Sequence, residues 1–235
     1  MQGYGGSVRT DEGWLGDLES PWRAALEMAW VSYQEGNTPV GAVIVDQLGQ
    51  VIGSGRSQRL SPFDGSGRLA GTNIAHAELS ALTCLPSGDY RDCTLYTTLR
   101  PCFVCATAVV QTRIGHVEFA GEDPVVDGVE RLPEIAHQMA RRWPSWNRPA
   151  AGPLRLLCEV LPLIFEYKHD QDGDLQTFET HSPGAAKIAR NLLADGRAQR
   201  LVTLPLADAT RLVPELYGAI TPVEHDVVVQ VPPFA

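Results

Sequence analysis

The 235-residue sequence contains no apolar run long enough to cross a bilayer, which takes about 20 residues. Its longest apolar stretch, residues 154–165, is interrupted by Arg155, Glu159 and Pro162. Residues 1–13 are polar and glycine-rich, whereas a secretory signal peptide needs an apolar core. The five cysteines are an odd number, which argues against a framework of disulfides and suits a reducing compartment. These absences predict a cytoplasmic protein with no membrane partner.

Basic residues are also scarce. The chain has 19 Lys and Arg against 28 Asp and Glu, which gives a net charge of −9. Proteins that bind nucleic acid independently of its sequence neutralise phosphates with basic side chains, so binding of this kind is not expected. A local basic patch would still allow a tRNA partner. The hydrophobic fraction of 44% is ordinary for a globular protein and predicts a substantial core.

One imidazole and two thiols occur in a pattern typical of a metal centre. His76 is followed two residues later by Glu78, and Cys102 and Cys105 lie three residues apart after Pro101. Zinc in proteins normally has four ligands, and a catalytic site keeps one of the four positions for water. His76, Cys102 and Cys105 would supply three ligands and leave Glu78 free. The sequence therefore predicts a catalytic Zn²⁺ site in which Glu78 is the general acid and base.

The same spacing predicts where two helices begin. Cys102 and Cys105 share a helix face if Pro101 opens the helix, a position that proline favours. His76 and Glu78 do not face each other inside a regular helix, so they converge only if a helix begins near His76. The first turn of a helix has free N–H groups and the positive end of the macrodipole, which stabilise thiolates. We expect two helix N-termini to point at one metal ion.

The combination of H-x-E with P-C-x-x-C is the signature of zinc deaminases of nucleobases. With it, the sequence resembles the zinc-dependent cytidine and deoxycytidylate deaminase superfamily. Residues 38–45, 94–99 and 113–115 are similar to the branch of bacterial tRNA-adenosine deaminases and guanine deaminases, and the resemblance covers residues 20–125. It implies hydrolytic deamination of an amino-purine or amino-pyrimidine nucleobase or nucleoside, with Zn²⁺ as cofactor. It also implies a five-stranded sheet and a homodimer.

The resemblance also implies a set of substrate-binding residues. Pro39, Val40 and the backbone of Ala77 would form walls of the pocket. Ser57 follows the second expected strand, where relatives usually carry an Asn that hydrogen-bonds the base or sugar. Ser57 either binds substrate with a shorter reach or faces water in a turn. Asp123 lies where relatives that act on guanine use an acid, although a simple turn before proline is the alternative.

Two other functions stay open. The first is deamination of an adenosine in a tRNA anticodon. The second is a zinc-stabilised binding module without catalytic activity, which would not need Glu78. Its zinc site would be structural, with Cys84 or Cys93 as the fourth ligand. Free cysteines are commonly buried, so we expect Cys84, Cys93 and Cys158 to lie in the core instead.

Two local features have weaker interpretations. Gly53-Ser54-Gly55 begins like a phosphate-binding loop, but Gln58 stands where that motif needs glycine. Arg100 precedes the Pro-Cys pair, at a position where the resembling family commonly has Glu or Ser. We expect Arg100 to be either a solvated loop residue or a contact to a substrate phosphate.

Helices and strands are expected to alternate along the first part of the chain. Serine and proline at residues 20 and 21 begin a helix, and β-branched runs between turn residues mark strands. This order predicts an α/β fold with three layers, α/β/α, around a mixed central sheet. The expected helices are 20–35, 76–84, 102–113 and 130–142, and the expected strands are 40–45, 50–55, 94–98 and 116–120.

Prolines and glycines at residues 146–153 predict a domain boundary. We expect a flexible N-terminus at residues 1–18, a zinc deaminase domain at 19–148, and a C-terminal α+β extension at 149–235 packed on it. No motif assigns a role to the extension. Its pattern favours strands at 154–157, 161–167 and 227–231 and helices at 182–193 and 207–216.

Overall fold

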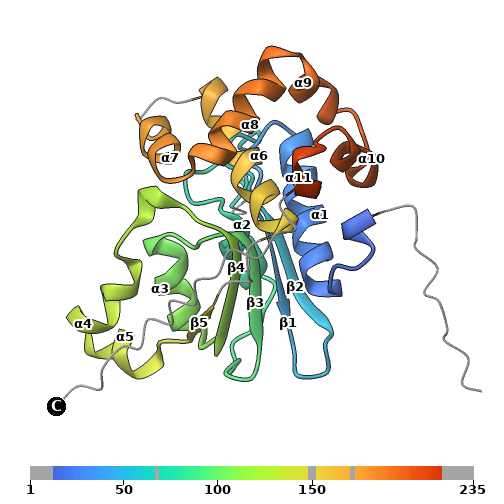
Figure 1. Ribbon diagram of the computed structural model, residues 1–235. Helices are drawn as coiled ribbons and strands as arrows, with labels where there is room; N and C mark the ends of the chain where they lie inside the picture. Colours follow the sequence, from blue (N-terminus) through green and yellow to red (C-terminus); the bar gives the residue numbers. More distant parts are fainter. Residues whose placement is uncertain (1–12, 67–68, 148–151, 170–172, 219–235) are drawn as a thin grey trace, which may run out of the picture.

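The computed structural model of the chain describes residues 13–66, 69–147, 152–169 and 173–218. Its centre is a five-stranded sheet with the order β2-β1-β3-β4-β5 (Figure 1). Strand β1 is antiparallel to both of its neighbours, and β3, β4 and β5 are parallel, so the predicted mixed sheet is confirmed. The strands are β1 (Gly41–Val45), β2 (Val51–Arg56), β3 (Thr94–Leu99), β4 (His116–Gly121) and β5 (Ser145–Asn147).

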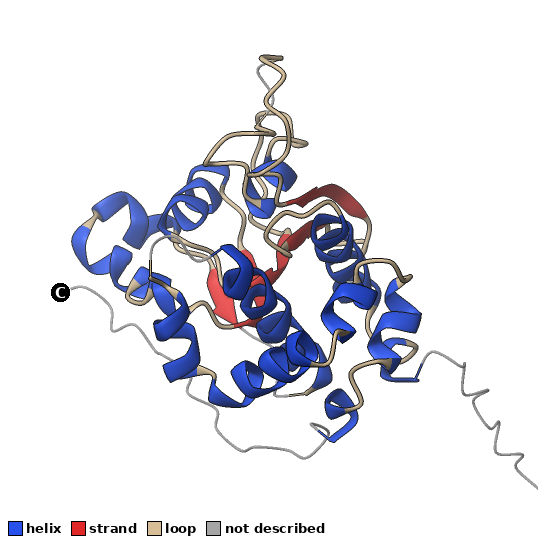
Figure 2. Cartoon of the chain, turned by 90° about the horizontal axis from the view of Figure 1, so that it is seen from above, coloured by secondary structure: helices blue, strands red, loops and turns tan. Residues whose placement is uncertain are grey.

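Helices cover both faces of the sheet, which gives the three predicted layers. Helices α1 (Ser20–Gln34) and α6 (Pro153–His169) pack on one face. Helices α2 (Ala77–Leu82) and α3 (Phe103–Thr112) pack on the other face. Seen from above, helices surround the strands (Figure 2). Because every residue of β1 is buried, this strand is apolar throughout instead of alternating with polar residues.

Glycines in the first two strands let helices approach the sheet closely. A Cβ atom on Gly55 of β2 would lie 2.3 Å from the carbonyl oxygen of Ala77 and 2.4 Å from the amide nitrogen of Ala81. A Cβ atom on Gly41 of β1 would lie 2.2 Å from the carbonyl oxygen of Ala25 in α1. The Gly53-Ser54-Gly55 sequence therefore lies inside a strand, where its glycines make room for α2.

The segment after β4 contains several short helices where one was expected. The predicted helix at 130–142 is interrupted at Ala136, which has an extended conformation with φ −140° and ψ 119°. The observed elements are η2 (Pro124–Val126), η3 (Val129–Arg131), α4 (Leu132–Ile135) and α5 (His137–Arg142).

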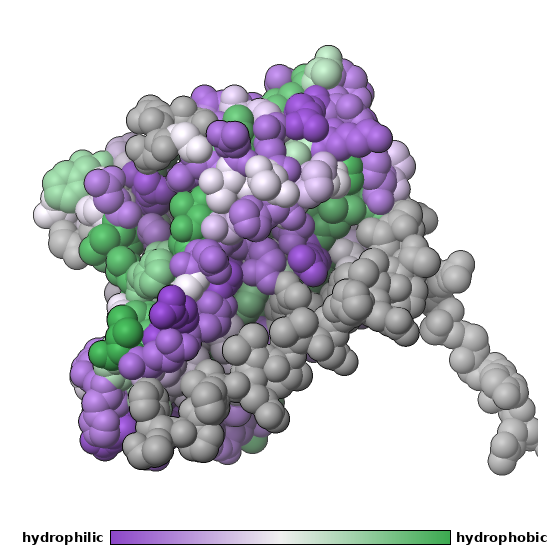
Figure 3. All heavy atoms as spheres, turned by 60° about the vertical axis from the view of Figure 1, so that its left-hand side comes forward, coloured by the Kyte–Doolittle hydropathy of each residue, from purple (hydrophilic) through white to green (hydrophobic). Residues whose placement is uncertain are grey.

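On the face that carries α3, α4 and α7, apolar side chains are scattered among polar ones (Figure 3).

The strands predicted at 154–157 and 161–167 are wrong, because both segments belong to the single helix α6. Leu154, Leu157, Leu161 and Ile164 recur at helical spacing and are buried. Burial of nearly the whole middle of α6, between the sheet and α8, makes its sequence look like that of a buried strand. Pro162 has no amide hydrogen for the carbonyl four residues earlier, yet the helix continues through it.

The described part of the extension is helical throughout, so its predicted α+β character is corrected there; the strand predicted at 227–231 lies outside the described residues. The helix predicted at 182–193 is confirmed as α8, and the one predicted at 207–216 is divided before Pro214. These helices gather at one end of the sheet (Figure 1). They are α7 (Leu175–His181), α8 (Pro183–Ala194), α9 (Arg197–Leu201), α10 (Leu206–Arg211) and α11 (Glu215–Gly218).

One hydrophobic cluster joins α1 to these C-terminal helices. Trp30 of α1 donates a hydrogen bond from Nε1 to the carbonyl oxygen of Leu204 at 2.9 Å, and the hydroxyl of Tyr33 donates to that of Ala198 at 3.1 Å. Leu15, in the short helix η1 (Gly13–Leu15), is buried in the same cluster. Within the described ranges, no helix is both long and apolar enough to cross a membrane.

Candidate active site

The sheet topology brings the candidate residues to one edge. Strand β1 is antiparallel to β2 and β3, and β4 is parallel to β3. The carboxyl ends of β2, β3 and β4 therefore lie beside the amino end of β1. Ser57 follows β2, Cys102 follows β3, Asp123 follows β4 and Val40 precedes β1. Sites in α/β proteins commonly lie at such an edge.

Two helix N-termini meet at this edge, as the spacing predicted. His76 is the N-cap of α2 and Cys102 is the N-cap of α3, and both residues have extended backbone conformations. Neither side chain caps its own helix, so both are directed to other partners. Pro101 does not open the helix, because α3 begins at Phe103, two residues later. The expectation that Pro101 is the first helical residue is thus wrong, although the two cysteines still converge.

The three donor atoms form a triangle. Nδ1 of His76 lies 3.5 Å from Sγ of Cys102 and 3.5 Å from Sγ of Cys105, and the two sulfurs are 3.6 Å apart. Zinc bonds of about 2.3 Å to sulfur and about 2.0 Å to nitrogen at tetrahedral angles separate the donors by roughly 3.5–3.8 Å. The group is positioned to hold a metal ion, and its spacing fits a tetrahedral ion of this size.

No other cysteine in the described ranges belongs to this group. Cys93 and Cys158 are buried in hydrophobic clusters, as expected. Cys84 is exposed, so the expectation that it lies in the core is wrong. Its thiol lies 3.5 Å from the carbonyl oxygen of Ser54. Neither Cys84 nor Cys93 is placed as a fourth ligand, which leaves one tetrahedral position without a protein donor among the described residues.

Glu78 lies in the first turn of α2, and only 3% of the residue is exposed. Burial raises the pKa of its carboxyl group to about 7, against an opposing effect of His76. The hydrogen bond from the thiol of Cys105 lowers the pKa of Cys102 to about 4, while the pKa of Cys105 itself is raised. The thiolate form of Cys102 is therefore favoured. The carboxyl group of Glu78 lies beside it and can gain or lose a proton near neutral pH.

A cavity of about 140 Å³ adjoins the donor group. Four of the five predicted substrate-binding residues line it, namely Val40, Ser57, Ala77 and Asp123. Pro39 is buried but is not among the lining residues. The remaining lining residues are Thr38, Arg59, His76, Glu78, Leu99, Arg100, Cys102, Val125, Pro162, Glu166, Asp174 and Phe178.

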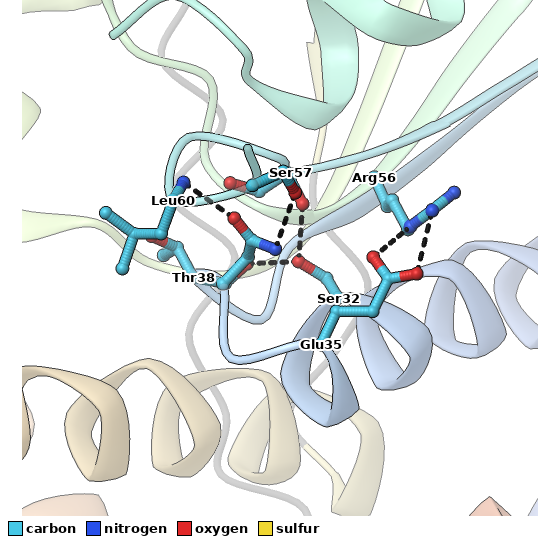
Figure 4. A network of polar contacts seen from close by, with 8 residues as sticks. Ser32, Glu35, Thr38, Arg56, Ser57 and Leu60 are labelled. Atoms are coloured by element: carbon cyan, nitrogen blue, oxygen red, sulfur yellow. Dashed lines mark hydrogen bonds and ion pairs between the residues drawn. The ribbon is translucent and has the colours of Figure 1, made fainter. Parts of the chain in front are cut away.

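Buried polar atoms without partners occur in the wall of this cavity. The hydroxyl groups of Thr38 and Ser57 are buried and have no hydrogen-bond partner among the residues that the structure describes. Their backbones are held by Ser32 of α1, whose hydroxyl bonds the carbonyl oxygens of Thr38 at 2.7 Å and Ser57 at 2.8 Å (Figure 4). Ser57 is only 2% exposed, so the alternative of a turn serine facing water is wrong. Buried polar groups without a partner in a cavity wall are available to a ligand.

Arg100 and Asp123 are both engaged with the protein as well as lining the cavity. Arg100 forms ion pairs with Glu130 and, at 3.6 Å, with Glu122, while its Nε atom has no partner within the described part of the chain. Its side chain is only 10% exposed, which excludes a solvated loop residue. Oδ1 of Asp123 accepts a hydrogen bond from the amide of Val125 at 3.1 Å, and burial raises the pKa of Asp123 to about 6. Both alternatives for Asp123 therefore hold, because it forms the turn before Pro124 and also lines the cavity.

Of the cavity residues that the sequence analysis missed, four lie in the C-terminal extension. Pro162 and Glu166 belong to α6, Asp174 directly precedes α7, and Phe178 lies within α7. No motif could have found them, because α6 was taken for two strands and α7 was not expected. Only the packing of the extension brings them to the site.

Comparisons with known proteins agree with the geometry. The family model for the cytidine and deoxycytidylate deaminase zinc-binding region matches residues 17–120. A tRNA-specific adenosine deaminase of Streptococcus pyogenes is 32% identical over 115 residues, which are 47% of this chain and 67% of that protein. This chain belongs to the cytidine and deoxycytidylate deaminase family. The matched region contains all three metal-binding candidates and Glu78.

Two other relatives of this deaminase-family chain match it over segments of different length. A cytosine deaminase of Candida albicans is 37% identical over 91 residues, which are 37% of this chain and 55% of that protein. A tRNA(Ile)-lysidine synthase of Deinococcus radiodurans is 28% identical over 191 residues, 78% of this chain but 31% of that protein. The chain thus spans only 31% and 55% of the length of these two relatives. Because 78% of the 235 residues is more than the 148 residues that precede the extension, the Deinococcus match includes part of the extension.

Removal of the metal is expected to destabilise the chain, because an ion that binds only the folded state adds its binding free energy to stability. A chelator should lower the Tm by about 5 °C or more, and added Zn²⁺ should restore it. Cys102→Ser should lose both the metal and this chelator effect. Cys84→Ser changes an exposed cysteine outside the group and should keep both. Equal metal contents in the two variants, measured by elemental analysis, would contradict the site.

Proposed function

We propose that this chain is a zinc-dependent hydrolase that deaminates an amino-purine or amino-pyrimidine, as the free base or the nucleoside, and releases ammonia. The observation that carries the proposal is the position of Glu78. This residue is only 3% exposed in the first turn of α2, beside a three-donor group that does not need its carboxyl group as a ligand. A structural metal site or a binding module has no use for a buried ionisable group there.

Zinc is proposed because one imidazole and two thiolates at tetrahedral spacing suit this ion. His76, Cys102 and Cys105 would hold it. When bound, it supplies a Lewis acid that lowers the pKa of a coordinated water molecule toward neutrality.

Glu78 would move the protons of the reaction. It takes a proton from the attacking water, whose oxygen forms a bond to the ring carbon that carries the amino group. It then passes that proton to the adjacent ring nitrogen. Glu78 next takes the proton of the newly attached hydroxyl group and gives it to the amino group. The carbon–nitrogen bond then breaks, the ring carbon becomes a carbonyl carbon, and the amino group leaves as ammonia. A carboxyl group with a pKa near 7 can serve in both directions at neutral pH.

The cavity supports a small substrate. At about 140 Å³ it is smaller than the roughly 300–1,000 Å³ of pockets for drug-sized ligands, and it suits a single ring system. Thr38, Ser57 and Asp123 offer hydroxyl and carboxyl groups, which match the N–H and carbonyl groups at the edge of a base. Binding roles for these three residues, and for Val40 and the Ala77 backbone, are part of the proposal.

Deamination of an adenosine in tRNA is the second candidate. It is favoured by similarity to tRNA-specific adenosine deaminases and opposed by the net charge of −9 and the acidic groups around the cavity. The homodimer implied by the resemblance stays a prediction. Phe103 and Val104 at the start of α3 are 43% and 50% exposed, which is compatible with a protein contact there.

Ammonia release from the zinc-loaded chain tests the proposal. The panel comprises cytosine, adenine and guanine, their nucleosides, and an anticodon stem-loop with an adenosine at the wobble position. We expect turnover of at least one base or nucleoside, with kcat/KM above about 10⁴ M⁻¹s⁻¹ for a good substrate. Activity on the stem-loop alone would replace the first candidate by the second. No ammonia from any compound would overturn deamination.

A further inference from the structure

Arg100 lies between the sheet and the metal-binding group. Its backbone amide donates a hydrogen bond to the carbonyl oxygen of Gly121 at 2.9 Å, which extends the pairing of β3 with β4 beyond Leu99. Only Pro101 separates it from Cys102, so the Cα atoms of Arg100 and Cys102 are at most about 7 Å apart. Arg100 lines the catalytic cavity, and its side chain is only 10% exposed. This residue therefore borders the space that a ring must occupy to reach the donor group.

Two of the three guanidinium nitrogens of Arg100 face carboxylates. Nη2 pairs with Glu130 of η3, and Nη1 lies 3.6 Å from Oε2 of Glu122. The third nitrogen, Nε, is buried and has no hydrogen-bond partner in the described ranges. A guanidinium is planar and its N–H groups point in fixed directions, so the contacts of the two Nη groups also fix the direction of the Nε–H bond.

The segment that carries Glu130 is itself fixed beside the metal-binding group. Its neighbour Val129 is fully buried in a small cluster with Ala106 of α3, and Cys102 packs against the same cluster. The guanidinium is thus held by a packed element and not by a mobile surface loop. Because both Nη groups already face carboxylates, a phosphate would have to compete with them. The capacity that Arg100 still has is one N–H donor.

This donor sets a condition on whatever enters the cavity. A buried donor in a cavity wall is satisfied by the molecule that occupies the cavity. A substrate that replaces water there must offer an acceptor, because leaving the donor buried and unpaired costs its full desolvation energy. The Nε–H group of Arg100 can only donate, whereas the unpaired hydroxyl groups of Thr38 and Ser57 can donate or accept. Arg100 therefore selects for an acceptor, which the two hydroxyl groups do not.

We infer that Arg100 binds the substrate: its Nε–H group donates a hydrogen bond to an acceptor on the edge of the ring, which is the carbonyl oxygen of cytosine or guanine, or N7 of adenine. This bond turns the carbon that carries the amino group toward the metal-binding group and Glu78. Amino-substituted rings without that acceptor are then poor ligands. The inference rests on the proposed function and adds a specificity-determining residue to the same site.

The acceptor is tested by calorimetric titration of the zinc-loaded Glu78→Gln chain, in which binding is measured without turnover. Three pairs of compounds differ in the acceptor. Cytosine is compared with 4-aminopyrimidine and guanine with 2-aminopurine, which both lack the carbonyl group, and adenine is compared with 7-deazaadenine. For the base that binds most tightly, loss of the acceptor should weaken binding about 10–100-fold, the range for a hydrogen bond from a charged donor. Equal affinities within every pair would overturn the inference.

The donor is tested with Arg100→Lys in the same background, which keeps the positive charge beside Glu122 and Glu130 but has no donor at the Nε position. Affinity for the base should fall about tenfold or more while affinity for its analogue changes less than about twofold. Arg155→Lys is the matched control, because Arg155 pairs with Glu159 at 2.8 Å and does not line the cavity. It should preserve both affinities. Equal losses for base and analogue in Arg100→Lys would give Arg100 a structural role only.

Turnover separates this inference from the proposed function. If the bases bind as described but the wild-type chain releases no ammonia, deamination fails while the role of Arg100 stands. If ammonia is released with the same kcat/KM from a base and its analogue, deamination stands while the role of Arg100 fails. A loss in Arg100→Lys that is confined to nucleoside 5′-monophosphates would make Arg100 a phosphate contact and overturn the inference. Binding of none of the three bases would overturn it as well.

Discussion

Glu78→Gln is expected to lower kcat by a factor of about 10³ or more while the metal stays bound. The glutamine amide has nearly the same shape, so the first turn of α2 and the neighbouring His76 are not displaced. It cannot accept a proton from water or return one to the leaving amino group. Because the buried carboxyl group costs desolvation energy, its removal should leave stability unchanged or raise it. A residue that reduces stability and is required for turnover has a functional role.

The measurement is kcat for ammonia release, with metal content and Tm determined on the same preparations. Glu27→Gln is the matched control, since Glu27 lies on the exposed side of α1 and does not line the cavity. It should keep full activity. Turnover by Glu78→Gln within tenfold of the wild type would contradict the role of Glu78 as proton carrier. Loss of the metal in this variant would instead show that Glu78 supports the donor group.

The centre of the site could be predicted from the sequence because its residues lie in short local patterns. His76 and Glu78 are two residues apart, and Cys102 and Cys105 are three apart, so the start of one helix fixes each pair. Ser57 and Asp123 could be placed because each lies within two residues of the end of a strand whose bounds were predicted within a residue or two. Residues that follow neighbouring strands can be placed at the same edge of the sheet from the strand topology alone.

The part of the cavity lining that comes from α6 and α7 could not be predicted from the sequence, because its position depends on tertiary packing. The middle of α6 is buried on nearly all sides between the sheet and α8, so its apolar residues resemble those of a buried strand, and Pro162 argues against a helix. Phe178 lies beyond the family-matched region and more than 70 residues after Cys102. Its distance from the metal-binding group depends on how α6 and α7 fold back over the sheet. Local patterns contain no information on such contacts.

The glycine at position 55 leads to the second large expected effect. Gly55→Ala should destabilise the fold by about 3 kcal/mol or more and lower the Tm by about 10 °C. The added Cβ would lie 2.3 Å and 2.4 Å from backbone atoms of α2, well inside van der Waals contact. Backbone atoms cannot rotate away as a flexible side chain would, so α2 must shift relative to β2. Since His76 is the N-cap of α2 and Glu78 lies in its first turn, the shift should also displace a metal ligand and weaken metal binding.

Thermal denaturation with and without a chelator measures both effects, and Gly184→Ala is the matched control. Gly184 is the second residue of α8, is exposed, and a Cβ there would meet nothing within 4 Å. Alanine is the better helix former by about 1 kcal/mol, so this variant should be as stable as the wild type or more stable. A glycine-to-alanine substitution should thus lower the stability of the fold at position 55 and maintain or raise it at position 184. If Gly55→Ala keeps the wild-type Tm and metal content, the close approach of α2 to β2 is not what positions His76 and Glu78 at the metal site.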